Sequence, residues 1–491
     1  MVTEFDVLQR RLGDALAANR PNSGTEHVLF VMPSHSVGES LLSHYADRVH
    51  ALEHRYLVAA LLLGRIRSCE MVILVSKAPA PEIIDYYISF LPEDARVSAR
   101  QRLRVEEIPG DNHRSMSDKL LDRPDLVSDL RDLVRGRPAF IEPWNVTDAE
   151  VDVACRLGVP LNGTSPALRG RAFKSAGRRL CEAAGVPVPL GREDLRSVDD
   201  IVRAVGELRA ARPSLQRVLI KLDDSGSGDG NMALDLTGPD SSEAGLRRRV
   251  GAMPSWYLGD LANGAVLEEY VSGSWFSSPS AQVDIGPGGD VSILSTHEQV
   301  LGGESGQVYL GCRFPASPRY ATEIADHARS IGRQLAKAGA IGRCGVDFVV
   351  AGTADGGHTV AAVDINLRKG GTTHPFTVLR NLVPGSYDAQ RARWTRATDG
   401  SERSYVATDN AVDPAWKGLR PAEVIAQVRA EGLEFDGAAG VGVVLHMLTG
   451  LAIDGRFGMT AVGRSTQEAD DLHQAALATV HRMGSTPASG R

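Results

Sequence analysis

One predicted hairpin constrains the fold of this 491-residue chain more than any other stretch of its sequence. Gly345–Val350 and Thr359–Ile365 are rich in valine and other apolar residues, which is typical of buried strands. The segment between them contains the sequence TADGG, whose small residues and paired glycines favour a turn. The sequence therefore predicts two antiparallel strands joined by a short connection.

Three oxygen-bearing side chains are predicted to lie on one face of this hairpin. Asp347 is on the first strand, and Asp364 and Asn366 are two residues apart at the end of the second. A lone aspartate in a strand is most often a solvated edge residue, so the prediction depends on the combination. Two carboxylates and an amide oxygen suit Mg²⁺ held between protein and nucleotide phosphates. Arg368 continues the same spacing if the strand extends that far, and its charge would stabilise a transferring phosphoryl group or an oxyanion.

Length and composition indicate a globular protein with three or four domains, because 43% of the 491 residues are hydrophobic and 23% are charged. The net charge of -7 offers no strongly basic domain, so we expect no nucleic-acid partner. The five cysteines are scattered without a CxxC pair, which indicates neither a disulfide framework nor a zinc site and fits a cytoplasmic location. The N-terminus is typical of a charged amphipathic helix, and the longest apolar run, Leu57–Gly64, is too short to cross a bilayer. We therefore expect no membrane partner.

The first 165 residues are predicted to form an open α/β layer. His27–Met32, Met71–Val75 and Pro138–Pro143 are short apolar runs typical of buried parallel strands, and a helix is expected from about Leu52 to Arg67. The loop Pro33–Glu39 leaves the first strand at the edge where such sheets place ligands, but it has no GxGxxG pattern. A packing role and a substrate-facing role both stay open for this loop.

Two lysines accompany features that suit nucleotide phosphates. Lys174 lies on the predicted helix Leu168–Ala184, which the sequence GVPVP ends. Lys221 lies near the end of a predicted strand, and the loop after it contains Gly226 and Gly228. Glycines let backbone N–H groups approach phosphate oxygens, and the lysine supplies a point charge. A glycine-rich loop alone is a weak signal, and this one is not a Walker A sequence.

These features occur in the order found in one enzyme superfamily. The sequence DINLRKGGTTHPF, which contains Asp364, Asn366 and Arg368, resembles the metal-binding end of the ATP-grasp fold, and the resemblance covers about Ser165 to Leu379. Asp364 stands where glutamate is more common, which shortens the reach of the ligand and keeps its charge. The resemblance implies ATP and Mg²⁺ as cofactors, with Asp347, Asp364 and Asn366 as the metal ligands.

The resemblance also implies a nucleotide site. The segment Ala265–Val271 resembles the ATP-grasp hinge, whose backbone reads the adenine edge. Trp275 stands near the place where many members have a ribose-binding glutamate, so no ribose contact is assigned. The implied nucleotide-binding residues are Lys174, Lys221, Gly226, Gly228, Glu268, Glu269 and Val271.

Within the superfamily, the chain most resembles the pheganomycin-type peptide ligases, through the sequences VLEEYVSG, DINLRKGGTTHPF and GVVLHMLTGLAIDGRFGMTAVG. This resemblance implies a multidomain fold of the α/β and α+β classes. Its parts would be an N-terminal Rossmann-like pre-ATP-grasp domain (1–165), an ATP-grasp core (166–400) and a small α+β C-terminal domain (401–491).

The same resemblance implies an ATP-dependent ligase. A carboxylic acid donor, for which the family suggests a guanidino-type acid, would become an acyl phosphate, and the amine of a peptide or amino acid would replace the phosphate. Arg368 and Lys221 would be catalytic. The expected acid-binding loop contains Gly370, Gly371, Thr372 and His374. A homodimer is left open.

Three other functions stay open at this stage. A phosphotransferase would stop at phosphoryl transfer, and an amino-acid or other simple carboxylate-amine ligase would accept free amino acids instead of peptides. A catalytically silent ATP-binding regulator would bind nucleotide without turnover, and the complete set of Asp347, Asp364, Asn366 and Arg368 argues against it.

Overall fold

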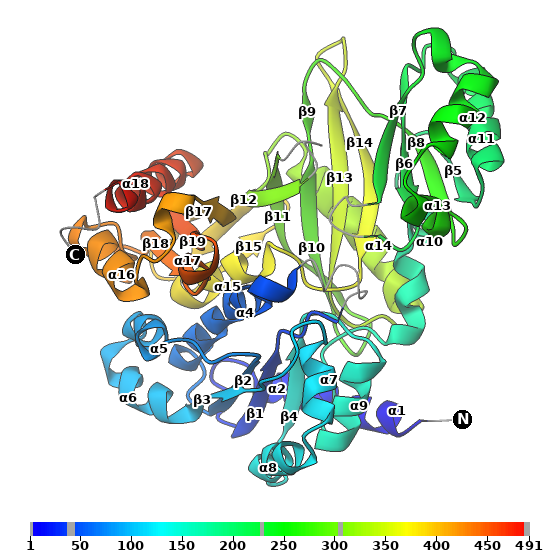
Figure 1. Ribbon diagram of the computed structural model, residues 1–491. Coiled ribbons are helices and arrows are strands. Elements are labelled where there is room, and N and C mark those ends of the chain that lie inside the picture. Colours follow the sequence, from blue (N-terminus) through cyan, green and yellow to red (C-terminus); the bar gives the residue numbers. More distant parts are fainter. Residues whose placement is uncertain (1–2, 37–44, 226–229, 303–307, 486–491) are drawn as a thin grey trace.

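The structure, a computed structural model, describes residues 3–36, 45–225, 230–302 and 308–485 (Figure 1). Three β-sheets with flanking helices make up the described residues. In Figure 1 the N-terminal elements lie at the bottom, a small sheet lies at the upper right, and a large central sheet continues into the C-terminal elements at the left. The mixed α/β fold class expected from the sequence is confirmed.

The N-terminal sheet has four parallel strands in the order β3-β2-β1-β4. Its strands are β1 (His27–Met32), β2 (Cys69–Val75), β3 (Leu103–Glu107) and β4 (Ala139–Pro143). All six residues of β1 are buried, because this strand has a neighbour on each side and helices over the sheet, so its sequence is continuously apolar. The three predicted strands are confirmed. The charged sequence LRVEE of β3 was not predicted as a strand, and it lies at the sheet edge, where charged residues are tolerated.

Helices connect these strands. The expected helix over residues 52–67 is divided into a short α-helix and a longer 3₁₀ helix. The helical elements of the segment are α1 (Glu4–Gln9), α2 (Leu12–Ala18), η1 (Ala46–Arg48), α4 (Val49–Glu53), η2 (His54–Gly64), α5 (Pro81–Ser89), α6 (Glu93–Arg102), α7 (Met116–Leu121), α8 (Pro124–Val134) and α9 (Asp148–Leu157).

A small antiparallel sheet follows, with the strand order β5-β8-β6-β7. Its strands are β5 (Gly191–Leu195), β6 (Arg217–Leu222), β7 (Asn231–Asp235) and β8 (Ala265–Glu269). Its helical neighbours are η3 (Pro166–Ala172), α10 (Lys174–Ala183), α11 (Val198–Ala211), η4 (Pro239–Ser241), α12 (Glu243–Gly251) and α13 (Ser255–Leu261). The apolar side chains of α11, α12 and α13 pack on this sheet and form a core of their own.

The large sheet contains eleven strands, and its main path runs β14-β13-β10-β11-β12-β17-β16-β15. The strands up to the predicted hairpin are β9 (Phe276–Ser277), β10 (Pro279–Ile285), β11 (Val291–Gly302), β12 (Val308–Phe314), β13 (Gly342–Gly352) and β14 (His358–Asn366). The hairpin of β13 and β14 is therefore confirmed, and it lies at one end of this path. Helix α14 (Ala321–Lys337) covers β10 and β11 with a buried stripe that includes Ile324, Ile331 and Leu335.

The C-terminal strands continue the large sheet. β12 pairs with β17 (Glu402–Val412), and β17 also pairs with β16 (Arg393–Arg396) and β19 (Arg456–Gly463). The remaining elements are α15 (Thr373–Leu382), β15 (Gly385–Asp388), η5 (Pro414–Trp416), α16 (Pro421–Ala430), β18 (Gly442–His446), α17 (Gly450–Ile453) and α18 (Thr466–Gly484).

The N-terminal and C-terminal segments share one hydrophobic core. Leu445 of β18 illustrates the contact, because its backbone N–H donates to the Tyr86 hydroxyl at 3.0 Å and its carbonyl accepts from the Tyr87 hydroxyl at 3.1 Å. Both tyrosines belong to α5. Among the described residues, none of the helices combines the length and apolar character that a membrane span requires.

Candidate functional site

The hairpin of β13 and β14 brings the predicted metal ligands together. Asp347 lies directly opposite Asp364 in the antiparallel register, and Gly345 lies opposite Asn366. The Asn366 amide donates to Oδ2 of Asp347 at 3.1 Å, and the Gln299 amide from β11 donates to Oδ1 at 3.0 Å. Both oxygens of Asp347 are therefore held by amides, and the Asp364 carboxylate is its neighbour across the strand pair.

The electrostatics of this pair suit a cation. Burial, and then the charge of the Asp364 carboxylate, raise the pKa of Asp347 to about 7. A divalent ion between the two carboxylates would remove this repulsion, and carboxylate and amide oxygens are the donors that Mg²⁺ prefers. The side chains present therefore fit the metal that the sequence predicts.

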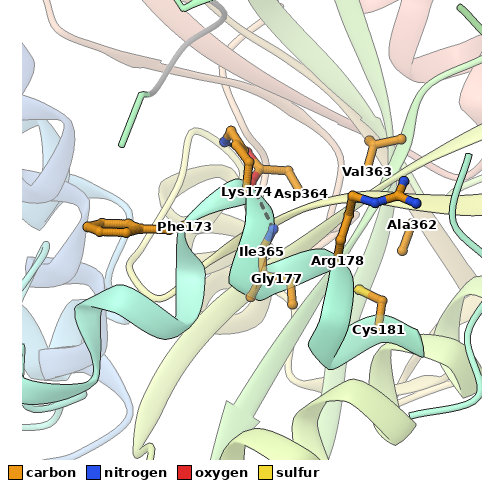
Figure 2. Close-up of a pocket in the computed structure, with 9 residues that line it drawn as sticks. All are labelled: Phe173, Lys174, Gly177, Arg178, Cys181, Ala362, Val363, Asp364 and Ile365. Atoms are coloured by element: carbon orange, nitrogen blue, oxygen red, sulfur yellow. Dashed lines mark hydrogen bonds and ion pairs between the residues drawn. The ribbon is translucent and has the colours of Figure 1, made fainter. Parts of the chain in front are cut away.

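Lys174 lies beside the same pair. Its Nζ is 2.7 Å from Oδ2 of Asp364, and both side chains are largely buried. Figure 2 shows Lys174 at the start of α10 next to Asp364 of β14, and both line a small pocket together with Phe173, Gly177, Arg178 and Cys181. The first turn of α10 is held in place by Asp223, whose Oδ1 accepts hydrogen bonds from the backbone N–H of Ser175 at 2.8 Å and from its hydroxyl at 2.7 Å.

Lys221 approaches the site from the small sheet. Its Nζ donates to the carbonyl of Val363 at 3.3 Å and is 2.6 Å from Oε2 of Glu268. Oε1 of Glu268 accepts from Nη1 of Arg178 at 3.0 Å. Glu268, an expected nucleotide contact, thus has both oxygens bound to buried cations. The two lysines reach the adjacent residues Val363 and Asp364 from different elements.

The other expected nucleotide residues are more scattered. Glu269 ends β8, where its carboxylate accepts from the backbone N–H of Leu190 at 2.9 Å and forms an ion pair with Arg212. Val271 follows β8 and is half-buried. Gly226 and Gly228 lie outside the described residues.

Arg368 lies beyond the end of β14, which stops at Asn366. Its guanidinium carbon is 5.0 Å from the centroid of the Trp144 ring, and its Nη1 donates to the carbonyl of Lys369 at 3.1 Å. Burial lowers the pKa of Arg368, and the charges of Asp364 and Asp347 oppose that shift. Arg368 therefore stays within the electrostatic field of the carboxylate pair although the strand has ended.

The loop after Arg368 lies between the N-terminal and C-terminal segments. Nζ of Lys369 is 2.6 Å from Oε1 of Glu142 on β4. At Gly371 an added Cβ would lie 2.5 Å from the Tyr309 ring, so only glycine fits there. An added Cβ at Gly370 would meet no atom within 4 Å.

Two other residues of this loop are buried. Thr372 is 4% exposed and its hydroxyl has no hydrogen-bond partner, while His374 is 1% exposed and its Nε2 is 2.8 Å from Oδ1 of Asp409. The side chain of His374 is thus engaged within the protein.

Sequence reasoning missed three residues that support the site, namely Trp144, Arg178 and Gln299. Each contacts a predicted site residue from an element distant in the sequence. Local patterns carry no signal for such contacts.

Comparisons with known proteins show the family and the fold of this chain. Residues 423–476 match the family model described as the PGM1 C-terminal domain. The L-propargylglycine–L-glutamate ligase of Streptantibioticus cattleyicolor is 33% identical to this chain over 455 residues, which is 88% of this chain and 92% of that protein. The chain belongs to the ATP-grasp superfamily of carboxylate-amine ligases. The resemblance to the pheganomycin-type ligases is thereby confirmed.

Solved structures show the same fold as this ATP-grasp ligase. The ADP complex of PurK, an N5-carboxyaminoimidazole ribonucleotide synthetase, has a TM-score of 0.53 at 14% identity and covers 94% of this chain and 98% of its own. The biotin carboxylase domain dimer of the Hydrogenobacter thermophilus 2-oxoglutarate carboxylase, solved with MgADP, ADP and bicarbonate, has a TM-score of 0.55 at 14% identity. It covers 93% of this chain and 90% of its own.

Proposed function

We propose that this ATP-grasp ligase uses ATP and Mg²⁺ to join the carboxylate of an acid donor to the amine of a peptide or amino acid. The observation that carries the proposal is the meeting of Asp347, Asp364 and Lys174 at one end of the hairpin, with a separation of 2.7 Å between Lys174 Nζ and Asp364 Oδ2. A paired-carboxylate site beside a lysine from another element suits a nucleotide triphosphate, whose phosphates need both a metal and a cation.

Asp347, Asp364 and Asn366 would hold Mg²⁺, which when bound neutralises phosphate charge. Lys174 and Lys221 would bind the phosphate oxygens. In the structure these lysines are paired with Asp364 and Glu268. A carboxylate partner offsets the cost of burying each ammonium group and holds the side chain in place.

The reaction would proceed in two steps. A carboxylate oxygen of the donor attacks the γ-phosphorus of ATP, which gives an acyl phosphate and ADP. The deprotonated amine then attacks the acyl carbon, and phosphate leaves as the amide forms. Arg368 would stabilise the charge of the transferring group in the first step and the tetrahedral oxyanion in the second. The contact of the Arg368 guanidinium with the Trp144 ring would help to hold the cation in position during the reaction.

The acceptor is the least defined substrate, and we propose a peptide. The loop Lys369–His374, the proposed acid-binding surface, lies between Glu142 of the N-terminal segment and Asp409 of the C-terminal segment. Both segments can therefore contribute remote contacts to an extended acceptor, and such contacts can orient the reacting amine.

A second candidate is a ligase that joins two free amino acids. It is favoured by the relative from Streptantibioticus cattleyicolor, whose name gives L-propargylglycine and L-glutamate as its substrates. The two candidates share the same chemistry and differ only in the size of the acceptor.

The experiment that tests the proposal is a matrix of acids and amines, assayed for ADP release and for new amide mass. Guanidino acids and ordinary amino acids serve as donors, and free amino acids, dipeptides and tripeptides serve as acceptors. The proposal predicts amide product only when donor, acceptor, ATP and Mg²⁺ are all present, with peptides as better acceptors. Equal use of free amino acids with refusal of longer peptides would select the second candidate. Phosphorylated acid as the final product would select a phosphotransferase.

We also propose the division of the ligase into residues 1–165, 166–400 and 401–491, with the metal, phosphate and acid-binding residues in the middle part. A cytoplasmic location fits the five free cysteines, because thiols persist in a reducing compartment. We propose a homodimer as the assembly, which light scattering at several protein concentrations would test.

A further inference from the structure

A second group of metal-ligand side chains lies away from the proposed Mg²⁺ site. His374 is in the first turn of α15, Asp409 is on β17, and His446 ends β18. Three strands, β10, β11 and β12, separate β17 from the β13–β14 hairpin in the sheet, while α15 lies against β17 (Figure 1). One ligand atom from each side chain lies within 4.8 Å of the other two. We propose that this group binds a late first-row divalent metal ion such as Zn²⁺.

The three ligand atoms lie close together, with Oδ1 of Asp409 near a nitrogen of each ring. Oδ1 of Asp409 is 2.8 Å from Nε2 of His374 and 3.6 Å from Nδ1 of His446. The two imidazole rings meet edge to face, with centroids 4.6 Å apart and planes at 83°. The two distances to Oδ1 place one nitrogen of each ring beside the carboxylate, as a metal bound by two imidazoles and one carboxylate requires.

An unpartnered nitrogen is the second observation. Nδ1 of His446 is buried and has no hydrogen-bond partner, although it faces Asp409 at 3.6 Å. A buried ring nitrogen without a partner is unfavourable by about 1–3 kcal/mol. A metal ion between His446 and Asp409 would use the nitrogen lone pair and remove this penalty.

The surroundings of the three ligands orient them. Nη1 of Arg55 donates to Oδ2 of Asp409 at 3.0 Å, which leaves Oδ1 directed toward the two histidines. Nε2 of His446 is 3.4 Å from the Thr460 hydroxyl, so the metal-facing atom of this ring is Nδ1. The ring lies directly over Gly458, where any Cβ would collide with it. Such hydrogen bonds to the outer atoms of ligands are common in metal sites.

The ligand set selects the class of ion. Two imidazoles and one carboxylate suit Zn²⁺ and its neighbours, whereas Mg²⁺ prefers oxygen ligands throughout. The positive charge of Arg55 opposes any cation, so a strongly bound ion such as Zn²⁺ is required in place of a weakly bound one. Three protein ligands leave one tetrahedral position for water. The ion would link His374, at the end of the loop Lys369–His374, to two C-terminal strands, which is a structural role separate from the binding of Mg²⁺.

The test uses the full-length protein and metal analysis. The purified protein is incubated with Zn²⁺, passed through gel filtration in buffer with excess Mg²⁺, and analysed for zinc by mass spectrometry. We expect about one zinc per chain. A parallel sample with Co²⁺ should show the visible absorption of four-coordinate cobalt. If the wild-type protein retains no zinc and gives no such absorption, the proposal is wrong. The three side chains then form only a hydrogen-bonded network.

Matched variants locate the ion. His446→Gln and Asp409→Asn should each lose zinc retention and the cobalt spectrum. His473→Gln is the control, because His473 on α18 is also buried and has no hydrogen-bond partner on either ring nitrogen, but it lies outside the group. If folded His446→Gln protein retains as much zinc as the wild type, the proposed site is wrong. If a variant fails to fold, the cobalt spectrum of the wild type still decides, since its bands distinguish coordination by imidazole from binding by oxygen alone.

Discussion

Replacing Asp364 by asparagine removes one charge from the carboxylate pair and leaves the size of the side chain almost unchanged. The structure gives opposing effects on stability. Burial is the largest cause of the raised pKa of Asp347, and the charge of Asp364 is the next largest. Removing the charge of Asp364 therefore removes a repulsion of roughly 1–2 kcal/mol. The loss also breaks the ion pair with Lys174 at 2.7 Å, a largely buried contact whose favourable contribution is on the order of 1–3 kcal/mol. The net change in the free energy of unfolding should therefore lie between a loss of about 2 kcal/mol and a gain of about 1 kcal/mol.

Activity should change far more than stability. Asp364 is one of two proposed carboxylate ligands of Mg²⁺, and removing a group that stabilises transition-state charge costs roughly 3–4 kcal/mol, a loss of about 10²–10³ in kcat. The assay is ADP release as a function of Mg²⁺ concentration, together with the thermal midpoint of each protein. Asn366→Ala should also lose Mg²⁺-dependent turnover, because it removes the amide oxygen of the same set.

The matched control is Asp355→Asn. Asp355 lies in the exposed turn of the same hairpin and bonds only within that turn, so this variant should turn over like the wild type. If Asp364→Asn protein turns over within tenfold of the wild type at the same Mg²⁺ concentration, the metal site has been placed wrongly.

Three further predictions concern the phosphate lysines, Arg368 and a buried carboxyl group. Lys221→Ala should raise the KM for ATP and lower kcat, whereas the control Lys337→Ala, at the exposed end of α14, should change neither. Equal kinetics for the two variants would show that Lys221 does not bind the nucleotide. Arg368→Lys should lower kcat by about 10–100-fold with little change in the KM for ATP, because lysine cannot reproduce the planar contact with the Trp144 ring; an unchanged kcat would exclude a catalytic role. Burial raises the pKa of Glu53 from 4.5 to about 7, so the folded protein holds this proton more tightly and loses stability as pH rises from about 4.5 to 7. Glutamine cannot lose a proton, so the stability of Glu53→Gln relative to the wild type should rise by on the order of 3 kcal/mol from pH 4.5 to pH 8 in denaturant titrations. If the free energies of unfolding of the two proteins change with pH in parallel, the raised pKa of Glu53 is refuted.

The sequence predicts local features of the site well. The strands of the hairpin were expected over Gly345–Val350 and Thr359–Ile365, and the structure extends them to Gly342–Gly352 and His358–Asn366. The alternation of side chains along a strand is a short-range property, so the shared face of Asp364 and Asn366 could be inferred before the register was known. The register itself, with Asp347 opposite Asp364, needed the structure.

Contacts between distant segments could not be predicted in this way. Trp144 and Arg368 are separated by more than 200 residues, and so are Arg55 and Asp409, and neither pair has a local signature. The C-terminal strands were expected to form a small α+β unit, and their pairing through β12 and β17 into the large sheet depends on a partner far away in the chain. The edge strand β3 was missed because its charged residues suit its exposed position better than the apolar pattern of a buried strand.

The central claim is that an acyl phosphate forms on the donor acid before the amine attacks, and isotope transfer tests it most directly. The donor carboxylate is labelled with ¹⁸O in both oxygens and incubated with the ligase, ATP, Mg²⁺ and the best acceptor from the matrix. Because one carboxylate oxygen bonds to phosphorus in the first step, each amide formed should release one phosphate that carries one ¹⁸O atom. Amide product accompanied by unlabelled phosphate would contradict the acyl-phosphate mechanism.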